Sequence, residues 1–170
     1  MKNIKQTIDS HNKSTLNNNA TQEPSDNNCN CRKDKTCPLD GKCLTPSLIY
    51  QATVTRLDTQ KTETYIGLTE NTFKTRFNGH LCSFRNSSKR NSTTLSQYVW
   101  YLKDNNIEFE IKWKIVDRGK PYSPGGKSCN LCIKEKYFII CKSHMATLNS
   151  RNELGSECRH RKKHLLANLS

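Results

Sequence analysis

Hydrophobic and polar residues alternate along three short segments in the middle of the chain, which is the period of two expected for β-strands. The alternation is clearest in residues 47–55 (SLIYQATVT) and 109–116 (FEIKWKIV), and the shorter ETYIG of residues 63–67 follows the first across LDTQKT. This turn-like connection predicts that the first two strands pair as a hairpin. The charged residues of the 109–116 segment predict a strand with one solvated face.

Three further segments have helical spacing. A first helix is predicted to begin at Glu70 with Thr69 as its cap, a second to cover about 95–103 and a third about 130–141. The order β-β-α-α-β-α predicts an α+β domain with a small three-stranded antiparallel or mixed sheet flanked by helices. The first helix carries one apolar stripe, formed by Phe73, Phe77, Leu81 and Phe84.

Composition divides the chain into four regions. Residues 1–28 are dominated by Asn, Ser, Thr, Lys and Gln, which predicts a disordered polar arm. Residues 29–46 are rich in cysteine, residues 47–152 carry the regular patterns, and residues 153–170 form a basic tail expected to pack on the domain. A hydrophobic content of 33% in 170 residues suits one modest core.

Net charge narrows the choice of partners. The formal net charge is +13, which favours a polyanion, either nucleic acid or an acidic membrane surface. We expect a soluble intracellular protein with no membrane partner, because no apolar stretch has the length of a membrane span and no basic amphipathic anchor is evident. Lys89, Arg90 and residues 159–164 are candidates for salt-dependent phosphate contacts, with a solvated charged tail as the alternative.

Nine cysteines in a reducing compartment are better interpreted as metal ligands than as disulfides. The first group has the spacing C-x-C-x5-C-x5-C, which supplies enough thiolates for a closed tetrahedral zinc site in a segment without a core of its own. The alternative is a reduced, cysteine-rich linker. The four predicted ligands are Cys29, Cys31, Cys37 and Cys43.

A second group consists of two close pairs on either side of the third helix. Cys129 and Cys132 lie at its start, and Cys158 and His160 lie in the basic tail, so one zinc ion would join the tail to the helix. Free thiols in a packed helix end are the alternative. Of the remaining cysteines, Cys82 and Cys141 are predicted to be small buried hydrophobes.

Arg76 and His80 lie four positions apart on the first helix, so their side chains project from the same face, beside the apolar stripe that docks on the sheet. An arginine fork held there suits a phosphate, because its planar donors match two oxygens at once. Taken alone, both residues are equally well explained as surface residues. Tyr50 and Tyr65, on the two hairpin strands, are by themselves ordinary β-formers.

Glu135 lies on the third helix on a largely apolar face, with Leu131, Phe138 and Ile139 one turn away on either side. A carboxylate half-buried on such a face needs a cation. The alternative is a glutamate on a wet face of the helix.

This combination resembles the GIY-YIG nuclease family, whose signature is a strand ending in GIY, a second strand with YIG, and a helix with an arginine and a histidine four residues later. The family also has a later helix with a glutamate and, beyond it, an asparagine. The resemblance covers about residues 47–150, with Leu48 in place of the first glycine of the signature. The matching positions are Leu48-Ile49-Tyr50, Tyr65-Ile66-Gly67, Arg76, His80, Glu135 and Asn149.

More narrowly, the CNCRKDKTCPLDGKCLTPSLIYQATV segment, the CNLCIKEK helix and the CRHRKKHLL ending are similar to the endonuclease domain of Penelope-like retroelements. In those elements the domain follows a reverse transcriptase, and this chain contains none. The resemblance implies DNA as substrate, action in the nucleus, and a reverse transcriptase domain or element RNA as further partners.

The resemblance also implies metal-assisted hydrolysis of a phosphodiester, with one Mg²⁺ or Mn²⁺ held by Glu135. Arg76 would stabilise charge on the phosphate, Tyr50 would be the general base towards water, and Tyr65 would orient water or phosphate. His80 and Asn149 complete the implied site. The main alternative is a non-catalytic, zinc-dependent nucleic-acid-binding module or an inactive nuclease relic.

Overall fold

The structure is a computed structural model that describes residues 28–32, 36–123, 126, 128–150, 158 and 160. The predicted polar arm therefore lies outside the described residues except for Asn28, and so does most of the basic tail. The elements, in chain order, are β1 (Leu48–Arg56), β2 (Thr62–Thr69), α2 (Phe73–Arg85), the short 3-10 helix η2 (Ser87–Lys89), α3 (Thr94–Asp104), β3 (Phe109–Arg118), α4 (Asn130–Cys141) and the 3-10 helix η3 (Ser143–Met145).

The three strands form one antiparallel sheet in the order β2-β1-β3, which confirms the predicted α+β class and hairpin and decides between the antiparallel and mixed alternatives. In the β1–β2 pair, Tyr50 lies opposite Gly67 and Ala52 opposite Tyr65. The β1–β3 pairing shifts register between Ile49 and Tyr50. β1 is thus the central strand, and the first tyrosine of the family signature lies in the middle of the sheet.

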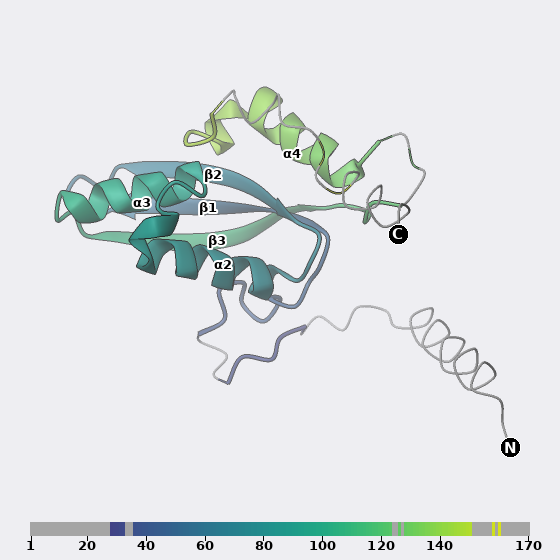
Figure 1. The fold of residues 1–170 in the computed structure, drawn as a ribbon, viewed down its shortest axis with the longest axis horizontal. Helices are drawn as coiled ribbons and strands as arrows, with labels where there is room; N and C mark the ends of the chain where they lie inside the picture. Colours follow the sequence, from purple (N-terminus) through teal and green to yellow (C-terminus); the bar gives the residue numbers. More distant parts are fainter. Residues whose placement is uncertain are drawn as a thin grey trace, which may run out of the picture.

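Helices cover both faces of the sheet (Figure 1). The face beneath α2 and α3 holds the larger core, to which β1 contributes Tyr50, Ala52 and Val54. The opposite face holds a smaller core of Ile49 and Ile66 beneath α4. Because side chains alternate along a strand, β1 is buried on both faces. The predicted apolar stripe of α2 faces the larger core, with Phe73 and Phe84 buried and Phe77 and Leu81 packed at its margin.

The start of α2 differs from the prediction. Its cap is Thr72, whose side chain accepts a hydrogen bond from Thr75 N, and the predicted cap Thr69 is instead the last residue of β2. β2 continues that far because Thr69 still pairs with Leu48. The first N–H groups of a helix have no intrahelical partner. In α2, Phe73 N donates to Thr45 O at 3.0 Å, which attaches the cysteine-rich segment to the helix.

The outer edge of β2 is covered by the chain that follows η3. Thr64 N donates to Thr147 Oγ1 at 2.8 Å, and Leu148 N donates to Thr64 O at 2.9 Å. These bonds pair backbone groups that an edge strand would otherwise leave open to another chain.

The prediction that Cys82 and Cys141 are buried is wrong, because both are exposed. Cys82 lies on the outer side of α2, where Lys89 Nζ approaches its sulfur at 3.4 Å, and Cys141 is the last residue of α4. Cysteine is a residue type that is often buried, but the position of each of these cysteines on its helix leaves it exposed.

Within the part of the chain that the structure describes, no helix has the length and apolar character needed to cross a bilayer.

Candidate functional site

The Tyr50 hydroxyl is the centre of a group of polar side chains between the sheet and α2. It accepts a hydrogen bond from Arg76 Nε at 2.9 Å and lies 2.7 Å from His80 Nε2. Arg76 only donates, so the hydroxyl is the acceptor of that bond, while the tautomer of His80 sets which partner donates in the bond between Tyr50 and His80. The three residues therefore form one hydrogen-bonded chain, which we call the Tyr50 cluster.

The spacing of four on α2 explains why one tyrosine can contact both partners. Arg76 and His80 lie one turn apart and flank the same hydroxyl. His80 is only 2% exposed, so it is not the surface residue of the alternative interpretation. The Tyr50 ring is itself held edge-on by Phe73, with ring centroids 5.2 Å apart, and packs at 5.9 Å against Trp113 of β3.

Gly67 provides the space for the Tyr50 hydroxyl. It lies opposite Tyr50 in the sheet, and a Cβ atom at this position would approach Tyr50 Oη to 2.4 Å and Tyr65 Cε1 to 3.0 Å. The phenol thus crosses β2 directly over this glycine. Sequence reasoning gave Gly67 no role of its own, although its place opposite Tyr50 in a predicted hairpin was a usable signal.

Burial sets the protonation states in the cluster. It raises the pKa of Tyr50 to about 12, with Glu135 contributing in the same direction and Arg76 opposing. Burial, helped by the charge of Arg76, lowers the pKa of His80 to about 3. At neutral pH the tyrosine is therefore protonated and the histidine is neutral.

Two further predicted residues approach the cluster from other elements. Tyr65, on β2, is buried and is a second hydrogen-bond partner of the Arg76 side chain. Glu135 comes from α4 on the opposite face of the sheet, is half-buried, and lies close enough for its charge to act on the Tyr50 hydroxyl. Tyr65 thus contacts the Tyr50 cluster through Arg76, and Glu135 acts on it through its charge.

Asn149 takes a different position from the one a catalytic role suggests. Its Oδ1 accepts from Ile66 N at 2.8 Å and its Nδ2 donates to Ile66 O at 2.9 Å. The side chain therefore pairs with β2 in the manner of a neighbouring strand. Since Ile66 lies between Tyr65 and Gly67, Asn149 fixes the part of β2 that carries both.

The first cysteine group gathers in space as predicted. The four sulfur atoms lie within 4.8 Å of one another, and the Cys29–Cys43 and Cys31–Cys43 distances are 3.4 and 3.7 Å. Burial would raise the pKa of Cys37, but N–H donors of Leu39 and Gly41 outweigh it and the pKa falls to about 7. Four converging sulfurs, one of them stabilised as a thiolate, could hold a metal ion such as zinc.

The second group also converges. The ligand atoms of Cys129, Cys132, Cys158 and His160 lie within 4.8 Å of one another. His160 Nδ1 is 3.4 Å from the sulfur of Cys129, 3.5 Å from that of Cys132 and 3.7 Å from that of Cys158. This set of three sulfurs and one imidazole nitrogen could hold a second zinc ion, one helical turn from Glu135.

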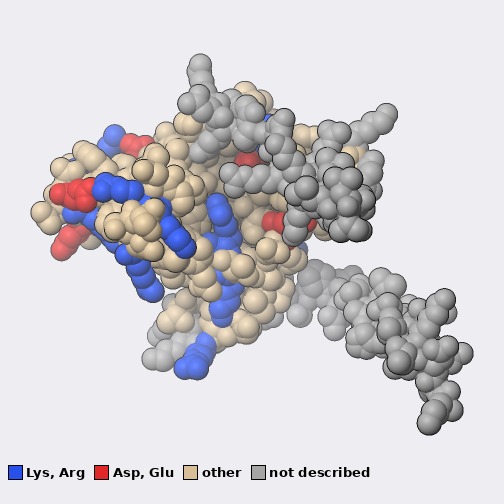
Figure 2. All heavy atoms as spheres, in the orientation of Figure 1, with Lys and Arg blue, Asp and Glu red and all other residues tan. Residues whose placement is uncertain are grey.

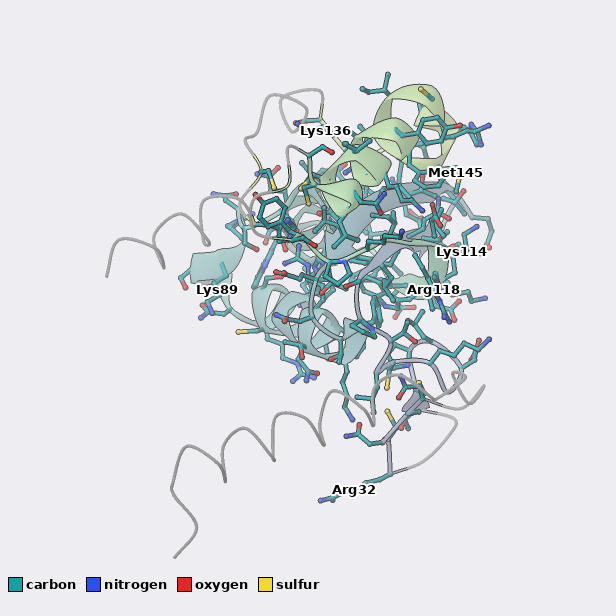
Figure 3. All side chains as sticks on the ribbon, turned by 90° about the vertical axis from the view of Figure 1, so that its right-hand side faces the viewer. Arg32, Lys89, Lys114, Arg118, Lys136 and Met145 are labelled. Atoms are coloured by element: carbon teal, nitrogen blue, oxygen red, sulfur yellow. The ribbon has the colours of Figure 1, made fainter. Side chains whose placement is uncertain are left out.

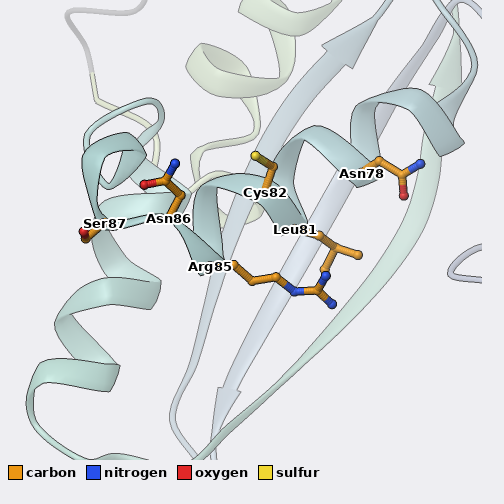
Figure 4. A pocket seen from close by; sticks show the side chains of 6 residues that line it. All are labelled: Asn78, Leu81, Cys82, Arg85, Asn86 and Ser87. Carbon is orange, nitrogen blue, oxygen red and sulfur yellow. The ribbon is translucent and has the colours of Figure 1, made fainter.

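A shallow concavity of about 580 Å³ lies beside the second half of α2 and the chain that follows it (Figure 4). No member of the candidate site is among its lining residues, so its shape carries no weight for the chemistry proposed below. It is lined by Asn78, Leu81, Cys82, Arg85, Asn86 and Ser87.

The surface is predominantly basic where it is described. In the face shown in Figure 2, Lys and Arg side chains form a line down the centre among uncharged residues, and Asp and Glu side chains lie at the left end and again to the right of the centre. The labelled basic residues come from three different elements, with Lys89 on η2, Lys114 and Arg118 on β3, and Lys136 on α4 (Figure 3).

Comparisons with family models, curated proteins and solved structures found no match for this chain.

Proposed function

We propose that the protein is a metal-dependent DNA endonuclease of the GIY-YIG type that nicks phosphodiester bonds. The observation that carries the proposal is the meeting of Arg76 and His80 at the Tyr50 hydroxyl, at 2.9 and 2.7 Å, with Tyr65 and Glu135 beside it. A sheet needs no such polar chain in order to pack, and burying three polar groups together is costly unless each is satisfied.

Each residue has a role that follows from its contacts. Arg76 presents further N–H donors beyond the Nε–H used by Tyr50, and these suit a phosphate oxygen whose charge grows during hydrolysis. Neutral His80 is hydrogen-bonded to the Tyr50 hydroxyl, and Tyr65 is a second hydrogen-bond partner of the guanidinium. Glu135, whose charge acts on the hydroxyl, offers a hard oxygen ligand.

Tyr50 by itself is a poor base, because its pKa is about 12 and that of its hydrogen-bond partner His80 is about 3. Mg²⁺ or Mn²⁺ held by Glu135 would supply the positive charge that favours the phenolate and polarises the scissile phosphate. The two cysteine groups would hold structural zinc. By the retroelement resemblance, the substrate is chromosomal DNA in the nucleus, with a reverse transcriptase or element RNA as partner.

The second candidate function is a non-catalytic, zinc-dependent nucleic-acid-binding module. One observation favours it: Tyr50 is fully buried and Tyr65 is 5% exposed, so both phenols are covered from water and phosphate, and of the side chains in the Tyr50 cluster only Arg76 is half-buried. The basic surface and the two cysteine groups serve this function equally well.

A nicking assay on supercoiled plasmid separates the two functions. We expect nicking that requires Mg²⁺ or Mn²⁺. The variants Arg76→Ala and Glu135→Ala should lose this activity. Their circular dichroism spectra and DNA affinities should stay close to those of the unchanged protein. Glu110→Ala, at an exposed glutamate on β3, is the matched control for Glu135→Ala and should retain activity. DNA binding without metal-dependent nicking in the unchanged protein would leave only the binding module.

A further inference from the structure

Glu70 lies in the connection between β2 and α2, and its carboxylate faces the second cysteine group. Glu70 Oε2 is 3.8 Å from His160 Nε2, while the other ring nitrogen of His160 faces the three sulfurs. Both side chains are largely covered, with 27% of Glu70 and 12% of His160 exposed. The imidazole thus stands between a thiolate cluster and a carboxylate.

A histidine that binds a metal usually donates its other N–H to a carboxylate, carbonyl or water, which fixes the ring and its tautomer. With Nδ1 directed at the metal position, the proton of His160 must be on Nε2, the nitrogen that faces Glu70. A distance of 3.8 Å exceeds that of a direct hydrogen bond. A hydrogen bond between Glu70 and His160 would therefore need a small rotation of the carboxylate or one bridging water.

We propose that Glu70 is the carboxylate that orients His160 on the second metal ion and thereby joins this site to the β2–α2 connection. The proposal rests on metal binding by the second cysteine group and does not require nuclease activity. It adds to the metal site a residue that lies 90 positions before His160 in the chain and that no ligand spacing would suggest.

The position of Glu70 links the metal to the candidate nuclease site. Its backbone oxygen accepts from Ser47 N at 3.2 Å, which holds the connection against the start of β1. Four residues later, Lys74 N donates to Cys43 O at 2.7 Å, next to the first cysteine group. Glu70 therefore faces the second cysteine group, and Lys74, in the first turn of α2, is bonded beside the first, before α2 presents Arg76. Glu70 is a positioning residue and not a catalytic one.

Zinc release tests the proposal directly. The zinc-loaded full chain is mixed with a chromogenic chelator, and the release phase of the second site is identified as the one missing in His160→Ala. We expect Glu70→Gln and Glu70→Ala to speed this phase about tenfold to a hundredfold and to leave the other phase unchanged. Glu110→Gln, an exposed glutamate on β3, is the matched control and should change neither phase. Release at the unchanged rate in both Glu70 variants would overturn the proposal.

A second measurement uses the unchanged protein, so it does not depend on the folding of any variant. Long-range ¹H–¹⁵N spectra of the zinc-loaded chain should show His160 with zinc on Nδ1 and a proton on Nε2. Zinc on Nε2, or an Nε2 proton that exchanges as fast as that of a fully exposed histidine, would overturn the proposal. Neither measurement involves DNA, so a failed nicking assay would leave this result intact.

Discussion

The Tyr50 cluster and the two cysteine groups are built by different physical means. In the cluster, polar side chains are held by aromatic packing inside a core, where Phe73 and Trp113 fix the phenol and burial sets the protonation states. In the cysteine groups, the four ligand atoms of each group lie within 4.8 Å of one another. The comparison teaches that the same chain stabilises one site by packing, whereas the other two have the ligand sets with which a metal ion could stabilise them.

The two cysteine groups also differ from each other. The first draws its ligands from one stretch, Cys29 to Cys43, whereas the second joins Cys129 on the chain leading into α4 to His160 in the tail. A metal ion in the first group would hold a local segment against the start of α2. A metal ion in the second group would close a longer connection and hold Cys158 and His160 beside the start of α4.

Metal removal should give the largest effect and should separate the two kinds of site. We expect Cys43→Ser to reduce the zinc content from two ions per chain to one. It should also lower the free energy of unfolding by several kcal/mol. Cys43 is fully buried, and its backbone carbonyl accepts a hydrogen bond from Lys74 N, so the segment held by the metal ion is attached to α2 at this residue. Metal analysis and thermal unfolding measure both. Exposed Cys141→Ser should keep two zinc ions and unchanged stability. Full stability of Cys43→Ser would show that packing also holds the first cysteine group.

Acid should affect the Tyr50 cluster through His80. The folded pKa of His80, about 3, lies below the ordinary value of 6.5, so its contribution to stability is present above pH 6.5 and is lost as the pH falls towards 3. The loss should be on the order of a few kcal/mol. Denaturant unfolding of the unchanged protein and of His80→Gln at several pH values measures it. The variant should have the flatter profile between pH 6.5 and 4; parallel profiles would contradict the burial argument.

Gly67→Ala should affect the Tyr50 cluster and spare the metal sites. The added methyl would lie 2.4 Å from Tyr50 Oη, so the phenol must move away from Arg76 and His80. We expect a loss of about 1–3 kcal/mol in unfolding free energy, together with loss of nicking and an unchanged zinc content. Gly79→Ala is the control, because a Cβ there meets no atom within 4 Å. Equal activity of the two variants would show that the approach of Tyr50 to Gly67 is unimportant.

Asn149→Ala should give the smallest effect. It removes two hydrogen bonds to the backbone of Ile66 at the edge of β2, and we expect a loss of about 1–2 kcal/mol in unfolding free energy. Amide exchange at Ile66 should become faster, since its N–H loses its partner. Nicking should fall and not disappear, because Asn149 acts through β2. Complete loss of nicking with normal stability would instead assign Asn149 a direct part in catalysis.

Much of the fold could be predicted from the sequence because the signals were local. The alternation of apolar and polar residues identified the three strands. Helical spacing predicted a helix over about residues 130–141, and α4 has these bounds in the structure. The cap of α2 was mispredicted at Thr69 because the length of β2 depends on its pairing with β1. Cys82 and Cys141 were predicted from residue type alone to be buried, and both are exposed. Burial depends on which side of a helix packs against the core.

The candidate site was predictable as a set of residues and not as an arrangement. Motif spacing selected Tyr50, Arg76 and His80, but the hydrogen-bonded chain, the steric role of Gly67 and the pairing of Asn149 with Ile66 appear only when the strands are in register. The contact between Glu70 and His160 joins residues 90 positions apart and has no sequence signal.

The sequence by itself therefore determined the main helices, the sheet-forming strands and the two sets of residues that could bind a metal ion, because periodicity and ligand spacing can be read along the chain. Tertiary structure alone decided which side chains meet and which are buried, since both depend on packing between distant segments. Burial in turn decided that Tyr50 keeps its proton and that His80 stays neutral.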